Sequence, residues 1–344
     1  MKQIDATVWV LLGARAGDNA QALELARRVG GQVVEKTLQF NRIAGIPSWV
    51  TGAGFATLEN ESRQILKAPW PDLVIATGRK TARISLAIKT VSRGQTKVVQ
   101  IGRPRLPLAS FDLVLTTAQY NLPPGPNVLE LPMPFAVPKP ADPASLKLFQ
   151  ETWKHLPKPW IVGVIGAAKF PVRFGGAELL HFSRCLNQLA QSSGGGVILL
   201  DSPRSTQGAL QSLAAQVTSP KWVWQRGVGQ NPYQAALALG DQFAVTSDSV
   251  SMVSEMVGTG KSTHVFHLPV SRLVPRWSAK VGFSAMLART GILSPPRDVA
   301  EFISGLEKAG WIGNLNEGRG PTERADFVGA LGGAVVRVRA LLSR

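Results

Sequence analysis

The proline-rich segment Pro132–Pro143 most constrains the fold, because it divides two regions that each alternate between apolar runs and amphipathic helical patterns. Five of its residues are proline, which lacks a backbone N–H and fixes φ, so the segment suits neither a helix interior nor a central strand. The segment therefore predicts an interdomain linker, which we place at residues 134–155. A first domain would occupy residues 1–133 and a second domain residues 156–277, with helices over residues 278–344 packed near the hinge.

Each domain is expected to be α/β, because short apolar runs typical of buried parallel strands alternate with helical patterns. In the first half we expect strands at Ala6–Leu12, Gln32–Leu38, Asp72–Thr77, Lys97–Ile101, Asp112–Thr116 and Val128–Leu131, and helices at Asn19–Val29, Ala56–Lys67 and Thr81–Val91. In the second half we expect strands at Trp160–Ile165, Gly196–Leu200, Trp222–Trp224, Phe243–Thr246 and Thr263–Phe266, and helices at Ala177–Gln191, Ser205–Val217, Pro232–Leu239 and Ser249–Val257. The predicted fold is two Rossmann-like, doubly wound domains facing across a cleft.

The composition narrows the class of ligand. The formal net charge of +16 favours polyanionic ligands such as sugar nucleotides, anionic lipid surfaces or nucleic acid, without choosing among them. Cys185 is the only cysteine, which excludes an intramolecular disulfide and fits a reducing compartment. Because no run of about 18 apolar residues occurs, we expect a cytoplasmic protein, or one bound peripherally at the inner membrane face.

The stretch from Gln242 to His267 carries the strongest functional signal, since it predicts a strand, a helix and a second strand. Ser249 is placed to cap the helix, whose free N–H groups would suit a phosphate. Ser251 and Glu255 share one helix face, with Glu255 about 9 Å beyond the helix start at ~1.5 Å per residue. A carboxylate there can accept both hydroxyls of a ribose. The alternative is an ordinary solvated helix face.

The glycines that follow this helix match part of the sequence motif of a phosphate-binding loop (P-loop). Gly258, Gly260 and Lys261 match its end, but Glu255 stands where the motif needs its first glycine. A P-loop also follows a strand and opens a helix, whereas these glycines follow a helix. We therefore interpret them as a helix end and a turn.

Other loops of the second half lie at predicted carboxyl ends of strands, where doubly wound sheets bind ligands. Arg204, Ser205 and Thr206 would open a helix and clamp a diphosphate, although an ordinary capped helix is the simpler alternative. Gly166 and Lys169 follow the first strand of the second domain and could approach the same phosphates. Asn231 ends the loop Gly227–Asn231, which we expect at the same crevice. The sequence lacks an Asp-x-Asp motif, so we expect no metal and no cofactor besides the nucleotide-sugar substrate.

Two loops of the first half are candidates for the acceptor side. The first joins a strand to a helix and contains Gly17, Asp18, Asn19 and Gln21. It lacks the G-x-G-x-x-G fingerprint, which disfavours a nicotinamide enzyme. Asp18 is either a helix N-cap or a general base for an acceptor hydroxyl. The second loop contains Gly78 and Arg79, before a helix whose start is suited to an anion.

These loops resemble those of the elongated-mitochondria family, which comprises bacterial proteins related to a plant mitochondrial-fission factor. The motifs that carry the resemblance span nearly the whole chain: Gly13…Gly17-Asp18-Asn19-Ala20-Gln21, Pro71–Arg79, Asn127-Val128, Ser202–Thr206, Asn231-Pro232-Tyr233 and Thr246–Glu255. The family is similar to two-Rossmann-domain (GT-B) glycosyltransferases. In those enzymes a helix start and a glutamate of the C-terminal domain hold the nucleotide. By position, the resemblance implies that Ser249 and Glu255 have this role.

Together these patterns favour a metal-independent glycosyltransferase that moves a sugar from a nucleoside diphosphate sugar to a lipid-linked or saccharide acceptor. One alternative is a sugar-nucleotide epimerase on the same fold, which would need no second substrate. Another is a non-catalytic, membrane-associated scaffold, as the plant relative's role implies. We expect a nucleotide sugar and an anionic lipid surface or lipid-linked acceptor as partners, and no nucleic acid.

Overall fold

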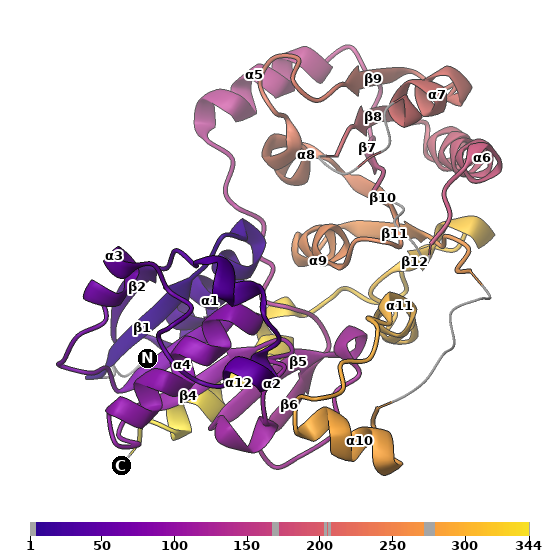
Figure 1. Cartoon of the computed structure of the whole chain (residues 1–344). Helices are drawn as coiled ribbons and strands as arrows, with labels where there is room; N and C mark the ends of the chain where they lie inside the picture. Colours follow the sequence, from indigo (N-terminus) through magenta and orange to yellow (C-terminus); the bar gives the residue numbers. More distant parts are fainter. Residues whose placement is uncertain (1–4, 167–171, 203–204, 206–207, 272–278, 344) are drawn as a thin grey trace. The chain divides into compact units, whose positions relative to one another are not determined.

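The chain forms two compact α/β units in the computed structural model, which describes residues 5–166, 172–202, 205, 208–271 and 279–343 (Figure 1). Unit 1 consists of Met1–Ala136, Trp277–Asp298 and Val328–Arg344. Unit 2 consists of Val137–Arg276 and Val299–Phe327. The predicted fold class of two doubly wound units is confirmed.

Unit 1 is built on a six-stranded sheet in the order β2-β1-β3-β4-β5-β6, with every neighbouring pair parallel. Its strands are β1 (Thr7–Leu12), β2 (Gln32–Thr37), β3 (Leu73–Thr77), β4 (Lys97–Ile101), β5 (Leu113–Thr117) and β6 (Val128–Leu131). The central strands are almost continuously apolar because helices cover both faces of a parallel sheet. All six strands lie within a residue or two of their predicted bounds.

The helices of unit 1 include pieces from distant parts of the sequence. They are α1 (Ala16–Val29), α2 (Ser48–Thr51), α3 (Asn60–Gln64), α4 (Arg79–Val91), α10 (Gly282–Arg289) and α12 (Phe327–Ala340), with short 3-10 turns η1 (Arg42–Gly45), η2 (Leu108–Ser110) and η3 (Ala118–Tyr120). The predicted helix at Ala56–Lys67 is wrong, since only α3 is helical there. Leu58 instead pairs with Phe40 in an isolated bridge, and the Ser62 hydroxyl accepts a hydrogen bond from the Gln39 N–H.

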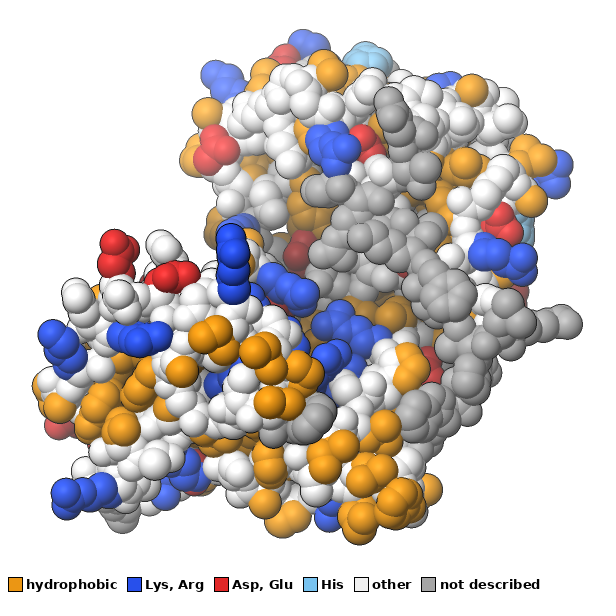
Figure 2. All heavy atoms as spheres, in the orientation of Figure 1, with side chains coloured by type: hydrophobic (Ala, Val, Ile, Leu, Met, Phe, Trp, Pro, Cys, Tyr) orange, Lys and Arg blue, Asp and Glu red, His pale blue; other side chains and the backbone are white. Residues whose placement is uncertain are grey.

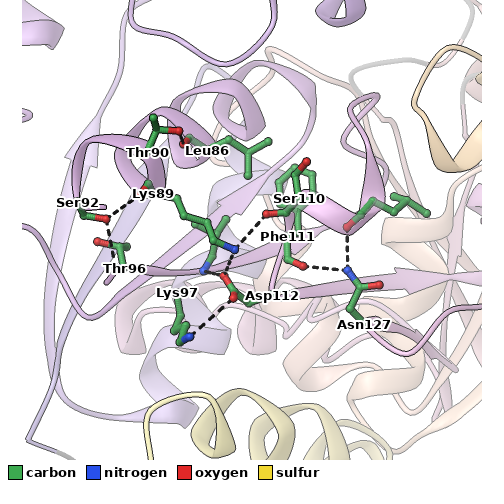
Figure 3. A network of polar contacts seen from close by, with 12 residues as sticks. Leu86, Lys89, Thr90, Ser92, Thr96, Lys97, Ser110, Phe111, Asp112 and Asn127 are labelled. Atoms are coloured by element: carbon green, nitrogen blue, oxygen red, sulfur yellow. Dashed lines mark hydrogen bonds and ion pairs between the residues drawn. The ribbon is translucent and has the colours of Figure 1, made fainter. Parts of the chain in front are cut away.

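A polar network fixes the amino ends of β4 and β5 (Figure 3). The Asp112 carboxylate accepts hydrogen bonds from the Val98 N–H and the Lys89 ammonium, each at 2.8 Å. The Asn127 amide donates to the carbonyl oxygens of Leu108 and Phe111. This network holds one edge of the sheet. The candidate functional residues lie at the opposite edge, at the carboxyl ends of the strands.

Unit 2 repeats the architecture with a six-stranded parallel sheet in the order β12-β11-β10-β7-β8-β9. Its strands are β7 (Trp160–Val164), β8 (Gly196–Leu200), β9 (Lys221–Trp224), β10 (Gln242–Thr246), β11 (Ser262–Phe266) and β12 (Gly313–Asn314). Its helices are α5 (Pro143–Trp153), α6 (Gly176–Ser193), α7 (Ala209–Gln216), α8 (Tyr233–Leu239), α9 (Val250–Gly258) and α11 (Val299–Lys308), with the 3-10 turn η4 (Leu315–Glu317).

Three boundaries in this half differ from expectation. The expected linker 134–155 contains α5, which Asp142 caps and which buries Phe149 and Trp153, so most of that segment belongs to unit 2. The helix expected from Ser205 begins only at Ala209, because Gly208 at its N-cap has φ +82°. The residues after 278 divide between the units: α10 and most of α12 belong to unit 1, and α11 belongs to unit 2.

We predict that α5 stabilises unit 2 through Trp153, which is fully buried and has ring centroids of Phe149, Trp160 and Trp222 within 5.2–5.7 Å. Trp153→Ala should lower the free energy of unfolding by about 3–5 kcal/mol. Urea denaturation followed by circular dichroism measures this. Leu148→Ala, on the exposed side of the same helix at 47% exposure, is the matched control and should cost under ~1 kcal/mol. Equal losses in the two variants would show that α5 is only a spacer.

Candidate functional site

The carboxyl ends of β7 and β10 are joined at the point where the strand order of unit 2 reverses. The chain proceeds from β7 outward to β8 and β9, and then returns to β10 on the other side of β7. Here the Gly166 N–H donates to the Thr246 hydroxyl at 2.8 Å, and that hydroxyl donates to Asp248 at 2.6 Å. A Cβ on Gly166 would overlap the Asp248 carboxylate, so glycine is required. Switch points of this kind are the usual ligand sites of doubly wound sheets.

Helix α9 starts directly beside this junction. Ser249 is its N-cap, and the Ser249 hydroxyl accepts a hydrogen bond from the Met252 N–H at 3.4 Å. Val253, Met256 and Val257 are buried and fix the helix against the sheet. Because α9 precedes the glycine turn and β11 follows it, the order of elements is opposite to that of a P-loop, as predicted.

Glu255 lies on α9 and is held by a residue of the neighbouring helix α8. The Tyr233 hydroxyl donates to Glu255 Oε2 at 2.8 Å. Burial raises the pKa of the Glu255 carboxyl, although the Tyr233 hydrogen bond and the charge of Lys139 oppose the shift. Burial and the Glu255 charge raise the pKa of Tyr233 well above its ordinary value, so Tyr233 stays protonated and remains a donor. Ser251, four residues before Glu255, is exposed.

The neighbouring loops of unit 2 are tied together by side chains at the strand ends. The Asp201 carboxylate, after β8, accepts from the Ser205 hydroxyl and from the Arg226 N–H, after β9. Asn231 Oδ1 accepts from the Tyr233 N–H at 2.9 Å and so fixes the start of α8. The predicted phosphate ligands Lys169, Arg204 and Thr206 lie outside the described residues.

Unit 1 has an equivalent reversal of strand order between β1 and β3. Asn19 closes the loop after β1, since its side-chain amide accepts from the Gly13 N–H and donates to the Gly13 carbonyl oxygen, both at 2.8 Å. The Gln21 amide donates to the Gly17 carbonyl oxygen at 3.5 Å. Asn19 therefore shapes the loop from within α1, where the predicted loop residues Gly17 and Gln21 also lie.

Asp18 lies within helix α1 and is not its N-cap, which corrects one of the two predictions for it. The helix begins at Ala16 and its N-cap is Arg15. Asp18 faces the second candidate loop, because a Cβ on Gly78 would lie 3.6 Å from its carboxylate. Gly78, with φ +85°, is the N-cap of α4, and Arg79 is the first residue of that helix.

The Asp18 carboxyl combines burial with nearby positive charge. Burial raises its pKa, and the guanidiniums of Arg15 and Arg297 only partly oppose the shift. Arg15 Nη1 lies 4.0 Å from Asp18 Oδ2. A carboxyl with a raised pKa is a stronger base when ionised, as general-base catalysis requires.

Comparison with known proteins identifies the family. A family model described as "Mitochondrial fission ELM1" matches residues 16–305. The chain belongs to this family. Mitochondrial fission protein ELM1 of Arabidopsis thaliana is 30% identical in a 235-residue alignment that covers 60% of this chain and 54%, about half, of the plant protein. An uncharacterised protein of Rickettsia prowazekii, RP120, is 26% identical over 299 residues, covering 76% of this chain and 83% of that protein.

A solved structure extends the likeness to the fold. A protein of Listeria monocytogenes assigned as a UDP-N-acetylglucosamine 2-epimerase aligns with a TM-score of 0.51 and 10% identity, over 98% of this chain and 97% of the other. At that identity the similarity concerns the architecture alone. The Listeria protein therefore has the same two-unit architecture as this ELM1-family protein.

Sequence reasoning missed the residues that orient the two predicted carboxylates. Tyr233 follows Asn231 in a motif shared with the family, but only the packing of α8 beside α9 makes it the partner of Glu255. Arg297 is separated from Asp18 by most of the chain. It lies near Asp18 because the segment after α10 belongs to unit 1. No local pattern could have indicated either pairing.

The described residues provide neither a cluster of metal ligands nor a membrane-spanning helix. Among the described residues, no group of three or more His, Cys, Asp or Glu side chains is placed to hold a metal ion. In the same part of the chain, no helix has the length and apolarity to cross a membrane. Cys185 is buried in α6, and burial raises the pKa of its thiol.

We predict that Glu255 makes stability depend on pH. Because its folded-state pKa is raised above the ordinary 4.5, its contribution to stability is fully present below that value and is lost as pH rises through the folded-state pKa. Glu255→Gln removes this loss, so the melting temperature of the variant relative to wild type should be higher at pH 7 than at pH 4.5. The exposed Glu323→Gln is the control and should show no such pH-dependent difference. A Glu255→Gln difference that is constant with pH would contradict the buried-charge interpretation.

Proposed function

We propose that this ELM1-family protein is a metal-independent glycosyltransferase that takes the sugar of a nucleoside diphosphate sugar and passes it to a lipid-linked or saccharide acceptor. The observation that carries the proposal is the position of Glu255. It lies partly buried on the helix that starts at the switch point of unit 2, and a tyrosine from the next helix holds one of its oxygens.

On the donor side, the start of α9 would bind phosphate and Glu255 would bind the ribose. The free N–H groups and partial positive charge of the helix start favour an anion beside Ser249. Each carboxylate oxygen of Glu255 can accept two hydrogen bonds, so the Tyr233 hydroxyl leaves capacity for both ribose hydroxyls. Tyr233 thereby serves as a positioning residue that fixes the carboxylate before the nucleotide arrives.

On the acceptor side, Asp18 would be the general base. It would take the proton of the acceptor hydroxyl as the hydroxyl oxygen bonds to the anomeric carbon and the diphosphate leaves. Proton transfer requires the base within hydrogen-bond reach, and Asp18 is partly exposed, with 31% of its side chain accessible. The guanidiniums of Arg15 and Arg297 favour the ionised form of this carboxyl.

Two experiments separate this proposal from its rivals. Nucleoside diphosphates and their sugars should raise the melting temperature, by an amount equivalent to about 2.7 kcal/mol at 100 times the dissociation constant. If none does, a non-catalytic scaffold gains support. Turnover of the sugar nucleotide without any acceptor would instead favour an epimerase, the activity assigned to the Listeria protein that shares the fold.

We predict that Glu255 recognises the ribose diol. Glu255→Gln replaces one acceptor oxygen with a donor and removes the charge, so nucleotide affinity should fall by roughly 1–3 kcal/mol, the range for charged hydrogen bonds. Isothermal titration calorimetry measures this. The dideoxyribose analogue is the matched control ligand, which should bind wild type and variant equally. Should the analogue separate the two proteins as strongly as the normal nucleotide does, Glu255 acts on another part of the ligand.

We predict that Asp18 is needed for the chemical step and not for donor binding. Asp18→Asn should lower kcat about 10²–10⁴-fold, the usual contribution of a general base, with nucleotide affinity unchanged. In wild type the rate should rise with pH through an apparent pKa above the ordinary 3.8, because only the ionised carboxyl accepts a proton. That dependence should vanish in Asp18→Asn and persist in the exposed control Asp5→Asn. An unchanged pH profile in Asp18→Asn would exclude the role.

A further inference from the structure

Two arginines contact Tyr120 at the carboxyl edge of the sheet of unit 1, and the charges of two more act on this group. This arginine cluster consists of Arg79, which begins α4, Arg103 and Arg105, which follow β4, and Arg297, which follows α10. Tyr120 ends the turn η3 after β5. Because the strands are parallel, the loops after β3, β4 and β5 share one edge of the sheet with Asp18.

Tyr120 is the centre of the cluster. Arg297 Nη2 donates to the Tyr120 hydroxyl at 3.2 Å, and the Arg297 guanidinium lies 4.9 Å from the ring centroid. The Arg103 guanidinium lies 5.9 Å from the same centroid. Both distances are in the range of cation–π contacts, so the ring partly offsets the repulsion between the two cations.

The guanidiniums of Arg103 and Arg105 are partly buried and lie near other cations. Burial and the charges of Arg105 and Arg297 lower the pKa of Arg103 to about 10. Burial and the charges of Arg79 and Arg297 lower the pKa of Arg105. Within the described part of the chain, none of the four arginines forms an ion pair with a carboxylate. Lys and Arg side chains are spread over both units (Figure 2). The four arginines of the cluster, by contrast, share one edge of the sheet of unit 1.

The backbone is also shaped for the cluster. Gly102 has φ +74°, and a Cβ there would lie 3.3 Å from the Tyr120 ring, so glycine lets the ring approach the loop. Arg105 is a non-glycine residue at φ +57°, a conformation that costs energy and is typical of ligand sites. Arg103 Nη1 donates to the Pro295 carbonyl oxygen, and the Asp298 N–H donates to the Gln119 carbonyl oxygen at 2.9 Å. These bonds hold the segment that carries Arg297 against η3.

We propose that the arginine cluster binds a phosphate or diphosphate group of the acceptor, which makes the second substrate an anionic molecule. This inference rests on the glycosyltransferase proposal, in which Asp18 on the same edge of unit 1 receives the acceptor's proton. Guanidinium groups form paired hydrogen bonds with phosphate oxygens, and a dianion placed among four cations removes their mutual repulsion. The neutral alternative, a saccharide without phosphate, would gain nothing from four converging cations.

Inorganic pyrophosphate is a suitable probe, titrated calorimetrically into the full chain at fixed ionic strength. The test variant is Arg105→Gln/Arg297→Gln, which keeps Arg103 and its bond to Pro295. The matched control is Arg42→Gln/Lys67→Gln, which removes the same charge from exposed positions of unit 1. We expect saturable binding to wild type and to the control, and at least tenfold weaker binding to the test variant. Equal weakening in both variants would overturn the site, as would the absence of saturable binding to wild type.

A second measurement distinguishes the acceptor's phosphate from the donor's. If the cluster serves the acceptor, pyrophosphate should still bind to protein saturated with nucleoside diphosphate, and the test variant should keep wild-type nucleotide affinity. Competition between the two ligands, with nucleotide affinity lost in the test variant as it is in Glu255→Gln, would overturn the acceptor assignment in favour of the donor diphosphate. Failure of the glycosyltransferase proposal looks different: no nucleotide binds to any variant. Pyrophosphate binding would then define an anion site that is not an acceptor site, and the assignment would also be overturned.

Discussion

The hydrogen bond from the Gly166 N–H to the Thr246 hydroxyl is the contact on which the candidate site of unit 2 depends. It joins the carboxyl ends of β7 and β10, the adjacent strands between which the strand order reverses. Thr246 is fully buried, so water cannot reach its hydroxyl. Loss of this hydroxyl would therefore leave the Gly166 N–H buried without a hydrogen-bond partner. The same hydroxyl orients Asp248, and two residues further along the chain α9 begins. The position of Glu255 is thus set by a contact outside its own helix.

Most of the strands could be predicted from sequence because they are buried on both faces. A strand such as Val8–Leu12 is apolar at every position, and no helix of that length would bury so continuous a run. Helix starts were less predictable where a side chain could serve either as a cap or as a first-turn residue. Aspartate is a common N-cap residue, but this helix already begins at Ala16, and the Asp18 side chain points toward Gly78 instead.

Only part of each candidate site could be predicted from the sequence, because the fold brings together residues that are far apart in the chain. A candidate site residue such as Glu255 belongs to a local pattern of strand, cap and helix, which a sequence displays directly. Its partner Tyr233 comes from a different helix, and the arginines around Tyr120 come from three segments separated by long stretches of chain. Parallel sheets bring distant loops to one edge, so the residues that complete a site have no fixed spacing.

The candidate sites of the two units differ in the side chains that they bring together. In unit 2 the described carboxylates near the strand ends are those of Asp201, Asp248 and, on α9, Glu255, and each already accepts a hydrogen bond from a hydroxyl. In unit 1 two of the four clustered arginines contact a single tyrosine, Tyr120, and the charge of one of them, Arg297, also acts on Asp18. Carboxylates accept hydrogen bonds from neutral hydroxyl groups, whereas guanidiniums bind oxyanions. A reaction between a nucleotide sugar and an anionic acceptor needs both surfaces. In the proposed reaction the carboxylate of Glu255 would recognise the donor by its ribose, and the arginines would bind the phosphate of the acceptor.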